Sequence, residues 1–477
     1  GALLALAARY DDAVRALESI GEAYPIVDHS DCFLVDEVVL GLARDLSTTA
    51  RALREAAESG AGISVDRVRH LYRRLVWIFR AELLSFERKR FASLSHEPNK
   101  AANLNSFIGL MGGRYRVRET HQGSILLPVR SGPFDMEEPD PDYVLTLDAD
   151  STLLPEYCLR LVAFMERPEN ADVAVAQTPY SAYRGATTRI ERIAGATTDL
   201  QHLVHQGLTR HDATFWVGAN AVLRKRALDD IRVEEPHNGF TVRRYIQDRT
   251  PIEDTESSID MRAHGWRLHN EPERLSYSAT PPDFGALCVQ RERWANGGLV
   301  ILPKLLRLRR TPRGTAGRPT LVELFLRVNY LASIAWASVG LWLLLAYPFD
   351  QRLLSRWAIL TALPYFVAQA NDLRRCGYRR IDVLGLYGFN LMLLAVNTVG
   401  AVKSVAQAIG GQKVAFARTP KVRNRTVAPL AYVLIPFLIA AWSGVTLAQD
   451  IAAGRTMHAV FAGVNASVLS DLPSMRG

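Results

Sequence analysis

The sequence predicts an α/β domain followed by membrane-spanning helices. Short apolar strands at residues 143–147 and 173–176 alternate with helical segments, which is typical of layered α/β folds. Residues 1–320 mix charged and apolar side chains as soluble domains do, whereas residues 321–470 are mostly apolar. A basic cluster of the kind found on the cytoplasmic side of membrane spans precedes the first apolar run. It consists of Lys304, Arg307, Arg309, Arg310, Arg313 and Arg318.

These features divide the chain into a cytoplasmic domain over residues 1–302, a basic juxtamembrane segment over 303–320, and transmembrane helices over 321–477. The net charge of +8 does not indicate a nucleic-acid partner, because no basic stripe is interleaved with aromatic residues. It favours contact with anionic membrane lipid instead. The four cysteines are scattered without metal-ligand spacing, so we expect reduced thiols.

The soluble part is predicted to be rich in helices. Apolar spacing predicts helices over residues 2–20, 35–58, 65–90, 94–110, 155–165, 254–264 and 284–302. Gly265 is a typical residue just past a helix end. Residues 24–31 form a short apolar run that ends in polar residues, which predicts a strand with Asp28 or Asp31 at its carboxyl end.

Several apolar runs are candidates for crossing a membrane. Residues 321–347 and 427–448 are long enough for about 30 Å of hydrocarbon. Residues 357–370 predict a marginal or tilted span, and residues 457–469 give a weak signal.

Residues 381–402 are a special case, because basic clusters lie on both sides of them. One simple crossing cannot keep both flanks in the cytoplasm, as the positive-inside rule requires. We therefore expect an interfacial or re-entrant segment over residues 381–426.

Asp148 and Asp150 follow directly after the predicted strand at residues 143–147. Open α/β sheets bind ligands at the carboxyl ends of strands, and residues i and i+2 of an extended chain point the same way. Two such carboxylates can hold Mg²⁺ or Mn²⁺ against a diphosphate. An isolated Asp-x-Asp is more commonly a solvated turn or a helix cap, and the preceding apolar strand favours a metal site here.

Asp254 lies at the start of a predicted helix, where the helix dipole favours an ionised carboxylate. A general base must be deprotonated at the working pH, so this position suits that role. The alternative is a helix cap, since acidic residues are enriched in first turns.

Gln290, Arg293 and Trp294 lie at i, i+3 and i+4 and therefore share one face of a predicted helix. This face offers an amide, a cation for a leaving diphosphate, and a flat ring on which a sugar can lie. Taken singly, Trp294 would more often fill a core or a membrane interface, and Arg293 could equally be a surface charge. Their joint spacing favours a sugar site beside the membrane part.

Taken together and in order, these motifs resemble those of the processive family-2 glycosyltransferases, the group of cellulose, chitin and hyaluronan synthases. The matching segments are residues 99–105, 148–150, 177–179, 215–221, 252–254, 290–294 and 416–421. Ile252 stands where the family has threonine, and Arg418 stands where valine is usual. The early Asp segment of the family is matched less well by residues 27–31, with His29 at a position that is often acidic.

The resemblance implies a GT-A-like nucleotide-sugar-binding domain and a role for individual positions. It implies donor or nucleotide contacts from Asp28, Lys100, Asp148, Gln290, Arg293, Thr419 and Lys421. It implies a Mg²⁺ or Mn²⁺ cofactor on Asp150 and Asp148, and acceptor contacts from Trp294, Glu253 and Gly218. Asp254 would be the catalytic base of a single displacement that inverts the anomeric carbon.

The resemblance further implies a cellulose synthase-like, multi-pass enzyme of the inner (cytoplasmic) membrane. It would move a sugar from a UDP-sugar, UDP-glucose being favoured, to a growing β-linked polysaccharide acceptor and export the product, and its further partners would be export or accessory subunits. Two alternatives stay open: a non-processive transferase that adds one sugar to a lipid, and an inactive membrane scaffold. The family also has a strand and two transmembrane helices before the position of Gly1, so the chain is either a shortened piece or built differently there.

Overall fold

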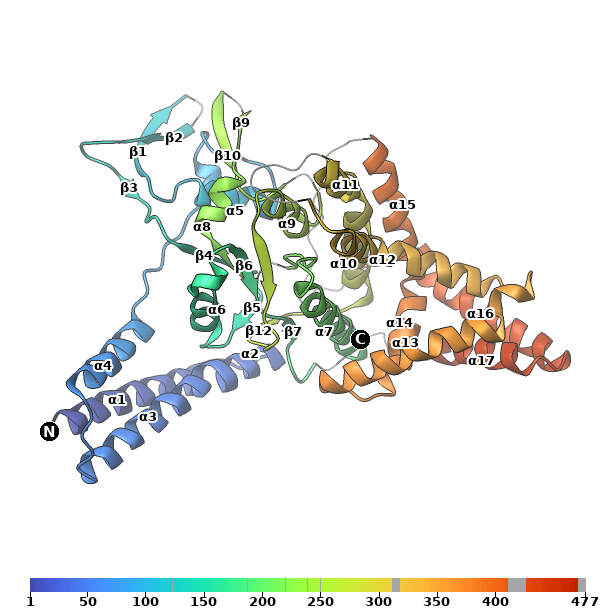
Figure 1. Ribbon diagram of the computed structural model, residues 1–477, viewed down its shortest axis with the longest axis horizontal. Helices are drawn as coiled ribbons and strands as arrows, with labels where there is room; N and C mark the ends of the chain where they lie inside the picture. The colour runs from blue at the N-terminus through green and yellow to red at the C-terminus, as the bar shows by residue number, and fades with distance from the viewer. Residues whose placement is uncertain are drawn as a thin grey trace. The chain divides into compact units, whose positions relative to one another are not determined.

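The computed structural model describes residues 1–477 apart from residues 122, 187, 219, 238, 249, 311–317, 411–425 and 471–477. Its elements belong to two compact units, each taken by itself below (Figure 1). The N-terminal unit comprises Gly1–Glu87, Thr152–Leu159 and Tyr183–Gly185. The main unit comprises Arg88–Ser151, Arg160–Ala182 and Ala186–Gly477.

The N-terminal unit is built from helices, as its sequence predicts. They are α1 (Ala2–Ala23), α2 (His29–Phe33), the π-helical turn η1 (Leu34–Val39), α3 (Leu40–Glu58) and α4 (Val65–Phe79). Leu6, Tyr10 and Leu46 lie in the apolar cluster between them. The hydroxyl of Tyr10 donates a hydrogen bond of 2.9 Å to the carbonyl of Leu71, which ties α4 to α1.

Two predictions for this unit are wrong. Residues 24–31 form no strand, because the Asp28 carboxylate accepts hydrogen bonds from the backbone N–H groups of Ser30 and Asp31 and caps α2. The helix predicted over residues 65–90 ends at Phe79, because Arg80 adopts an extended conformation with φ −94° and ψ 105°.

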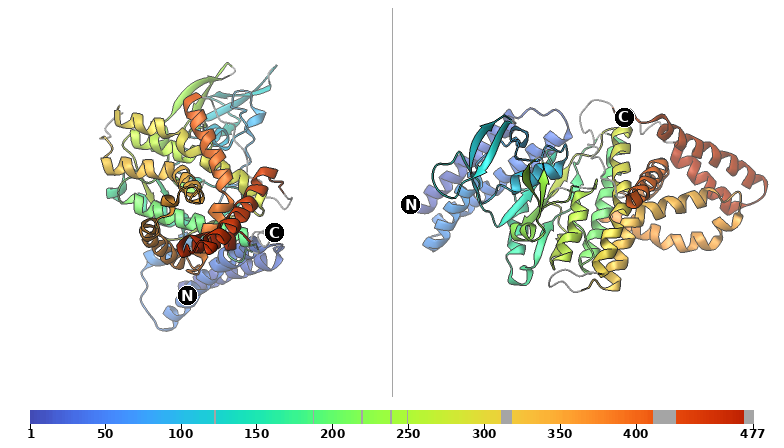
Figure 2. Two further views of the ribbon diagram at one scale, coloured as in Figure 1. Left: turned by 90° about the vertical axis from the view of Figure 1, so that its right-hand side faces the viewer. Right: turned by 90° about the horizontal axis from the view of Figure 1, so that it is seen from above.

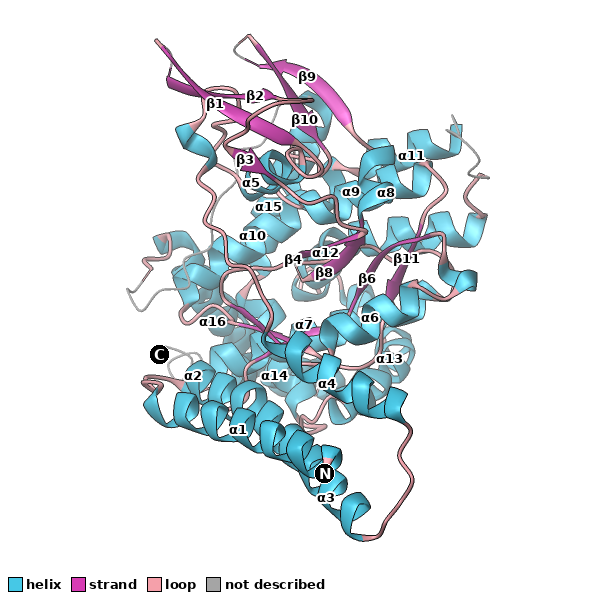
Figure 3. Cartoon of the chain, turned by 90° about the vertical axis from the view of Figure 1, so that its left-hand side faces the viewer, coloured by secondary structure: helices cyan, strands magenta, loops and turns pink. Residues whose placement is uncertain are grey.

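The main unit is centred on a mixed four-stranded sheet in the order β11-β6-β8-β4 (Figure 3). Its strands are β4 (Tyr143–Thr146), β6 (Val173–Gln177), β8 (Ala221–Arg224) and β11 (Arg267–Asn270). β11 runs parallel to β6, whereas β8 is antiparallel to both β6 and β4. The side chains of this sheet form one apolar cluster with residues of α5, α8 and α9. The predicted α/β class is confirmed.

The remaining elements complete the two units. The other strands are β1 (Arg114–Thr120), β2 (Gly123–Pro128), β3 (Met136–Glu137), β5 (Ser151–Leu153), β7 (Tyr180–Ala182), β9 (Val233–His237), β10 (Phe240–Arg244) and β12 (Ser276–Ser278). The other helices are η2 (Arg88–Arg90), α5 (Lys100–Ile108), α6 (Tyr157–Met165), η3 (Pro168–Asn170), α7 (Arg189–Thr209), α8 (Lys225–Asp230), α9 (Glu253–Ala263), α10 (Phe284–Val300), α11 (Leu302–Arg310), α12 (Leu321–Leu345), η4 (Gln351–Leu354), α13 (Arg356–Arg375), α14 (Asp382–Met392), α15 (Leu394–Gly410), α16 (Leu430–Ala452) and α17 (Thr456–Ser470).

Among the described residues, α12 and α16 are the helices that are long and apolar enough to cross a membrane. The pair α14 and α15 is apolar enough but bends by 55°, the geometry of a broken span or a re-entrant loop (Figure 2, orange to red). The interfacial or re-entrant arrangement of residues 381–402 stays a prediction. α13, predicted to be a marginal or tilted span, does not belong to this group, because polar residues fill its last two turns.

α10 packs closely against two of these C-terminal helices. Gly298 faces the backbone of α12, and a Cβ atom at this position would lie 2.3 Å from the carbonyl oxygen of Leu331. On another side, the backbone N–H of Val300 donates a hydrogen bond of 2.8 Å to the Ser404 hydroxyl of α15. α10 therefore belongs to the sheet domain and to the C-terminal helices at once.

We predict that Gly298→Ala lowers the melting midpoint of the detergent-solubilised chain, because α10 and α12 must move apart. Overpacking of this kind typically costs about 1–3 kcal/mol. The matched control is Gly340→Ala on α12, where a Cβ atom meets nothing within 4 Å. Equal midpoints for the two variants would contradict the close approach.

Candidate active site

One cavity of about 800 Å³ in the main unit gathers most of the predicted site residues. The predicted residues that line it are Lys100, Asp148, Asp150, Gly218, Glu253, Asp254, Gln290, Arg293 and Trp294. Tyr330, Leu331, Ser333 and Ile334 line it as well, and all four belong to α12. The cavity therefore borders a candidate membrane span.

Asp28, Thr419 and Lys421 complete the set of predicted site residues. Asp28 belongs to the N-terminal unit, where its hydrogen bonds with Ser30 hold the pKa of its carboxyl below the ordinary value. Its local role is the cap of α2, and its nucleotide contact stays a prediction. Thr419 and Lys421, with Arg418, lie outside the described residues.

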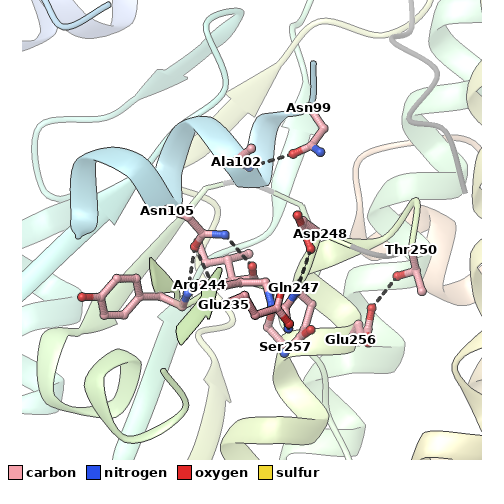
Figure 4. Close-up of polar contacts among 12 residues, drawn as sticks. Asn99, Ala102, Asn105, Glu235, Arg244, Gln247, Asp248, Thr250, Glu256 and Ser257 are labelled. Atoms are coloured by element: carbon pink, nitrogen blue, oxygen red, sulfur yellow. Dashed lines mark hydrogen bonds and ion pairs between the residues drawn. The ribbon is translucent and has the colours of Figure 1, made fainter. Parts of the chain in front are cut away.

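The carboxylate of Asp148 is fixed by two parts of the main unit. Asn99 caps α5 by accepting a hydrogen bond of 2.7 Å from the N–H of Ala102, which starts the helix at Lys100 (Figure 4). The ammonium of Lys100 donates a hydrogen bond of 2.6 Å to Oδ1 of Asp148. The side chain of Asn220 accepts from the backbone N–H of Asp148 at 3.3 Å, which anchors the loop after β4.

Asp150 and Asp148 both line the cavity and offer two carboxylates to a divalent cation, whose coordination a bound diphosphate would complete. Among the described residues, no three His, Cys, Asp or Glu side chains are grouped to hold a metal by themselves. Mg²⁺ commonly takes one or two carboxylates and fills its other positions with water and substrate phosphates, so a pair is sufficient.

The carboxylate of Asp254 is held at the N-terminus of α9 by backbone donors. The N–H of Thr255 donates to Oδ1 at 2.7 Å, and the N–H of Gly218 donates to Oδ2. Gly218 has a φ of +78°, and a Cβ atom there would lie 2.5 Å from the ring of Tyr180. Only glycine fits this turn, which aims an N–H group at Asp254.

Tyr180 is in turn held in place by His202. Its ring packs edge-on against that of His202 with 4.7 Å between the centroids, and its backbone N–H donates to Nε2 of His202 at 3.4 Å. Burial lowers the pKa of His202 to about 3, so the imidazole is neutral and accepts this bond. His202 thus holds Tyr180, whose ring lies close to Gly218. The N–H group of Gly218 in turn binds the carboxylate of Asp254.

Two adjacent carboxyl groups share this part of the cavity. Burial raises the pKa of Asp254, against the effects of its N–H donors and of the positive charges of Lys100 and Arg293. Burial and the neighbouring charge of Asp254 raise the pKa of Glu253 to about 7. Asp254 is the one with two backbone donors, so it ionises first and Glu253 keeps its proton longer.

Gln290, Arg293 and Trp294 share one wall of the cavity, as the helical spacing predicts. Arg291 also lines it, and the sequence reasoning missed this residue. Its guanidinium lies 4.6 Å from the centroid of the Trp294 ring and donates to the Thr197 hydroxyl at 2.5 Å. The signal was its i, i+3 spacing to Trp294, which brings the two side chains together on a helix.

Residues that do not line this cavity also hold its elements in place, and sequence reasoning did not assign them this role. Asn105, in the predicted nucleotide segment, accepts from the N–H of Ile246 at 2.8 Å and so supports the chain before α9 (Figure 4). Gln247 N–H donates to the Ser257 hydroxyl at 2.9 Å, which fixes α9 itself. The later turns of α9 line a second cavity of about 920 Å³, where Lys304 pairs with Glu256.

Residues 143–369 match the family model described as glycosyl transferase family group 2. The chain contains a family-2 glycosyltransferase domain. The matched range begins at β4, which precedes the carboxylate pair, and includes Asp254 and the cavity wall of α10.

Curated relatives support the same family. The chain is 29% identical over 172 residues to glucans biosynthesis glucosyltransferase H of Xanthomonas campestris pv. campestris (strain B100), covering 33% of this chain and 24% of the relative. It is 26% identical over 166 residues to probable glucomannan 4-beta-mannosyltransferase 7 of Oryza sativa subsp. japonica, covering 34% and 26%. It is 25% identical over 162 residues to a UDP-forming cellulose synthase of Dictyostelium discoideum, covering 34% and 14%. The match thus spans about a quarter or less of each relative's length.

We predict that Glu253 makes the chain less stable as the pH rises. The pKa of Glu253 is about 7 in the folded chain and 4.5 ordinarily. Between these values the folded state keeps a proton that the unfolded state has released, so the free energy of unfolding falls with rising pH, by on the order of 1–3 kcal/mol.

Melting midpoints at about pH 5 and about pH 8 check this prediction. Glu253→Gln should flatten the difference between the two midpoints, whereas the exposed control Glu156→Gln should leave it unchanged. An unaltered difference in Glu253→Gln would show that this carboxyl does not hold its proton.

Proposed function

We propose that the chain is the catalytic part of a membrane-embedded inverting glycosyltransferase. It moves a sugar from a UDP-sugar, UDP-glucose being favoured, to a growing β-linked glucan and passes the product across the inner membrane. The observation that carries this proposal is a single cavity lined by a carboxylate pair, by Asp254, by the cation and indole of α10, and by α12. The relatives named for glucan and cellulose synthesis support the choice of glucose, whereas the relative named glucomannan 4-beta-mannosyltransferase favours mannose.

Positively charged side chains hold the donor through its negatively charged diphosphate. Lys100 and Arg293 both line the cavity and act electrostatically on the acidic pair at Glu253 and Asp254. Mg²⁺ or Mn²⁺ on Asp150 and Asp148, when bound, neutralises charge on the leaving diphosphate. The protein groups orient the donor so that its anomeric carbon faces the acceptor.

Asp254 is the base of the transfer step. It takes the proton of the acceptor hydroxyl while the hydroxyl oxygen bonds to the anomeric carbon, and the bond from that carbon to the diphosphate breaks. The electron pair of the broken bond leaves with UDP, and the attack from the opposite side inverts the anomeric carbon. The N–H groups of Gly218 and Thr255 keep the carboxylate oriented for this role.

Trp294 is the platform for the acceptor sugar. Arg291 lies against its ring and fixes the orientation of the indole. Because Tyr330 and Ile334 of α12 line the same cavity, a glycan that leaves the indole meets the candidate spans next. This arrangement favours retention of the growing glycan between sugar additions and its export along the helices.

We predict that Asp254→Asn lowers sugar transfer at least about 100-fold, because the amide cannot accept the acceptor proton. UDP release from UDP-glucose with Mg²⁺ or Mn²⁺ measures the reaction. Asp12→Asn on the exposed surface of α1 is the control and keeps wild-type release. Full activity in Asp254→Asn would overturn the assignment of the base.

We also predict that Trp294→Ala shortens the product, because the acceptor dissociates between additions. Trp294→Phe keeps a ring in place and should give products close to wild-type length. Gel filtration of the product measures its length. Single-sugar products from the wild-type chain would favour the non-processive alternative, and equal lengths in the two variants would remove the platform role.

A further inference from the structure

Helix α4 of the N-terminal unit carries two apolar faces. Val68, Leu71 and Leu75 pack against the core of the unit. Val65, Tyr72, Val76 and Phe79 form a second stripe at spacings of seven, four and three residues, and all four are exposed. Val76 is 58% exposed and Val65 is 74% exposed, so the N-terminal unit taken by itself leaves this stripe uncovered.

Positive charge lies beside the exposed stripe. Within α4, four arginines stand against one acid, Asp66, and Arg80 follows directly at its C-cap. On a helical projection Arg69 and Arg73 flank the stripe on one side. Arg69 pairs with Asp66 at 2.8 Å on the surface, so the helix keeps an excess of positive charge.

An exposed aromatic residue adds to this pattern. Trp77 is 64% exposed, and the guanidinium of Arg80 lies 5.1 Å from its ring centroid. Tryptophan and arginine together are typical of the level of lipid headgroups, where the ring meets the acyl boundary and the guanidinium meets phosphate.

We propose that α4 lies in the surface of an anionic bilayer, with its exposed stripe in the headgroup and acyl boundary. An amphipathic helix with apolar and aromatic residues on one face and arginines beside them binds in this way. The chain also carries candidate membrane spans in α12 and α16, which supports a bilayer as the partner of this helix. Pairing of two copies of α4 along this stripe is disfavoured, because it would bring the flanking arginines of both copies together.

Lipid quenching in the full chain tests this proposal. The chain is placed singly in nanodiscs, with Cys32→Ser and Cys158→Ser introduced and the buried Cys288 and Cys376 left in place. A fluorescent label is attached at Val76→Cys on the stripe or at Ala52→Cys on the exposed side of α3 as a control. Phospholipids brominated along their acyl chains, either phosphatidylglycerol or phosphatidylcholine, serve as quenchers.

The proposal predicts quenching at Val76→Cys by at least about twofold in brominated phosphatidylglycerol, and little quenching at Ala52→Cys. Adding Arg69→Glu and Arg73→Glu should reduce the quenching at Val76→Cys, because the attraction to anionic headgroups is lost. Absence of quenching at Val76→Cys, or equal quenching at both positions, would overturn the proposal. Energy transfer between labels in discs holding two chains, without lipid quenching, would assign the stripe to a second copy and overturn it equally.

Discussion

The carboxylate of Asp254 is the group on which the arrangement of the cavity depends. A carboxylate that is withdrawn from water needs hydrogen-bond donors or opposite charge. The chain supplies the N–H groups of Gly218 and Thr255, together with the charges of Lys100 and Arg293. Gly218 can approach only because it lacks a side chain above Tyr180. The glycine turn, the start of α9 and the wall of α10 are therefore parts of one electrostatic arrangement.

A second constraint joins this site to the C-terminal helices. Five residues of α10 line the cavity, while Glu292 on the same helix accepts a hydrogen bond of 2.9 Å from Tyr432 of α16 and pairs with Lys403 of α15. The apolar cluster around Leu287 and Cys288 of α10 includes residues of α7 and of α14 to α17. Because these groups are packed in one core, the C-terminal helices hold the position of α10, the helix that carries Trp294.

Local patterns in the sequence predicted part of this site, and the family resemblance implied Lys100, Gly218 and Glu253 as well. The spacing of Gln290, Arg293 and Trp294, and the strand that ends before Asp148, depend only on near neighbours along the chain. The structure places these residues in the same cavity as Asp254. Contacts between distant segments could not be foreseen. Asn105 acts on a backbone 141 residues away, and Lys100 meets a carboxylate 48 residues away.

The errors have local causes as well. Asp28 reads as the end of a strand, but its side chain competes for backbone N–H groups and starts a helix instead. The helix predicted through residue 90 follows good helical propensity, yet the helix stops after Phe79, where contacts with the core of the N-terminal unit also end. Helical propensity alone does not show where these packing contacts end.

The most direct test of the account is an electron cryo-microscopy map of the full chain with UDP and Mn²⁺. The account predicts the diphosphate and the cation beside Asp150, Lys100 and Arg293. The indole of Trp294 should face the part of the same cavity that the nucleotide does not fill. Nucleotide density in the second cavity, beside Glu256 and Lys304, would contradict it.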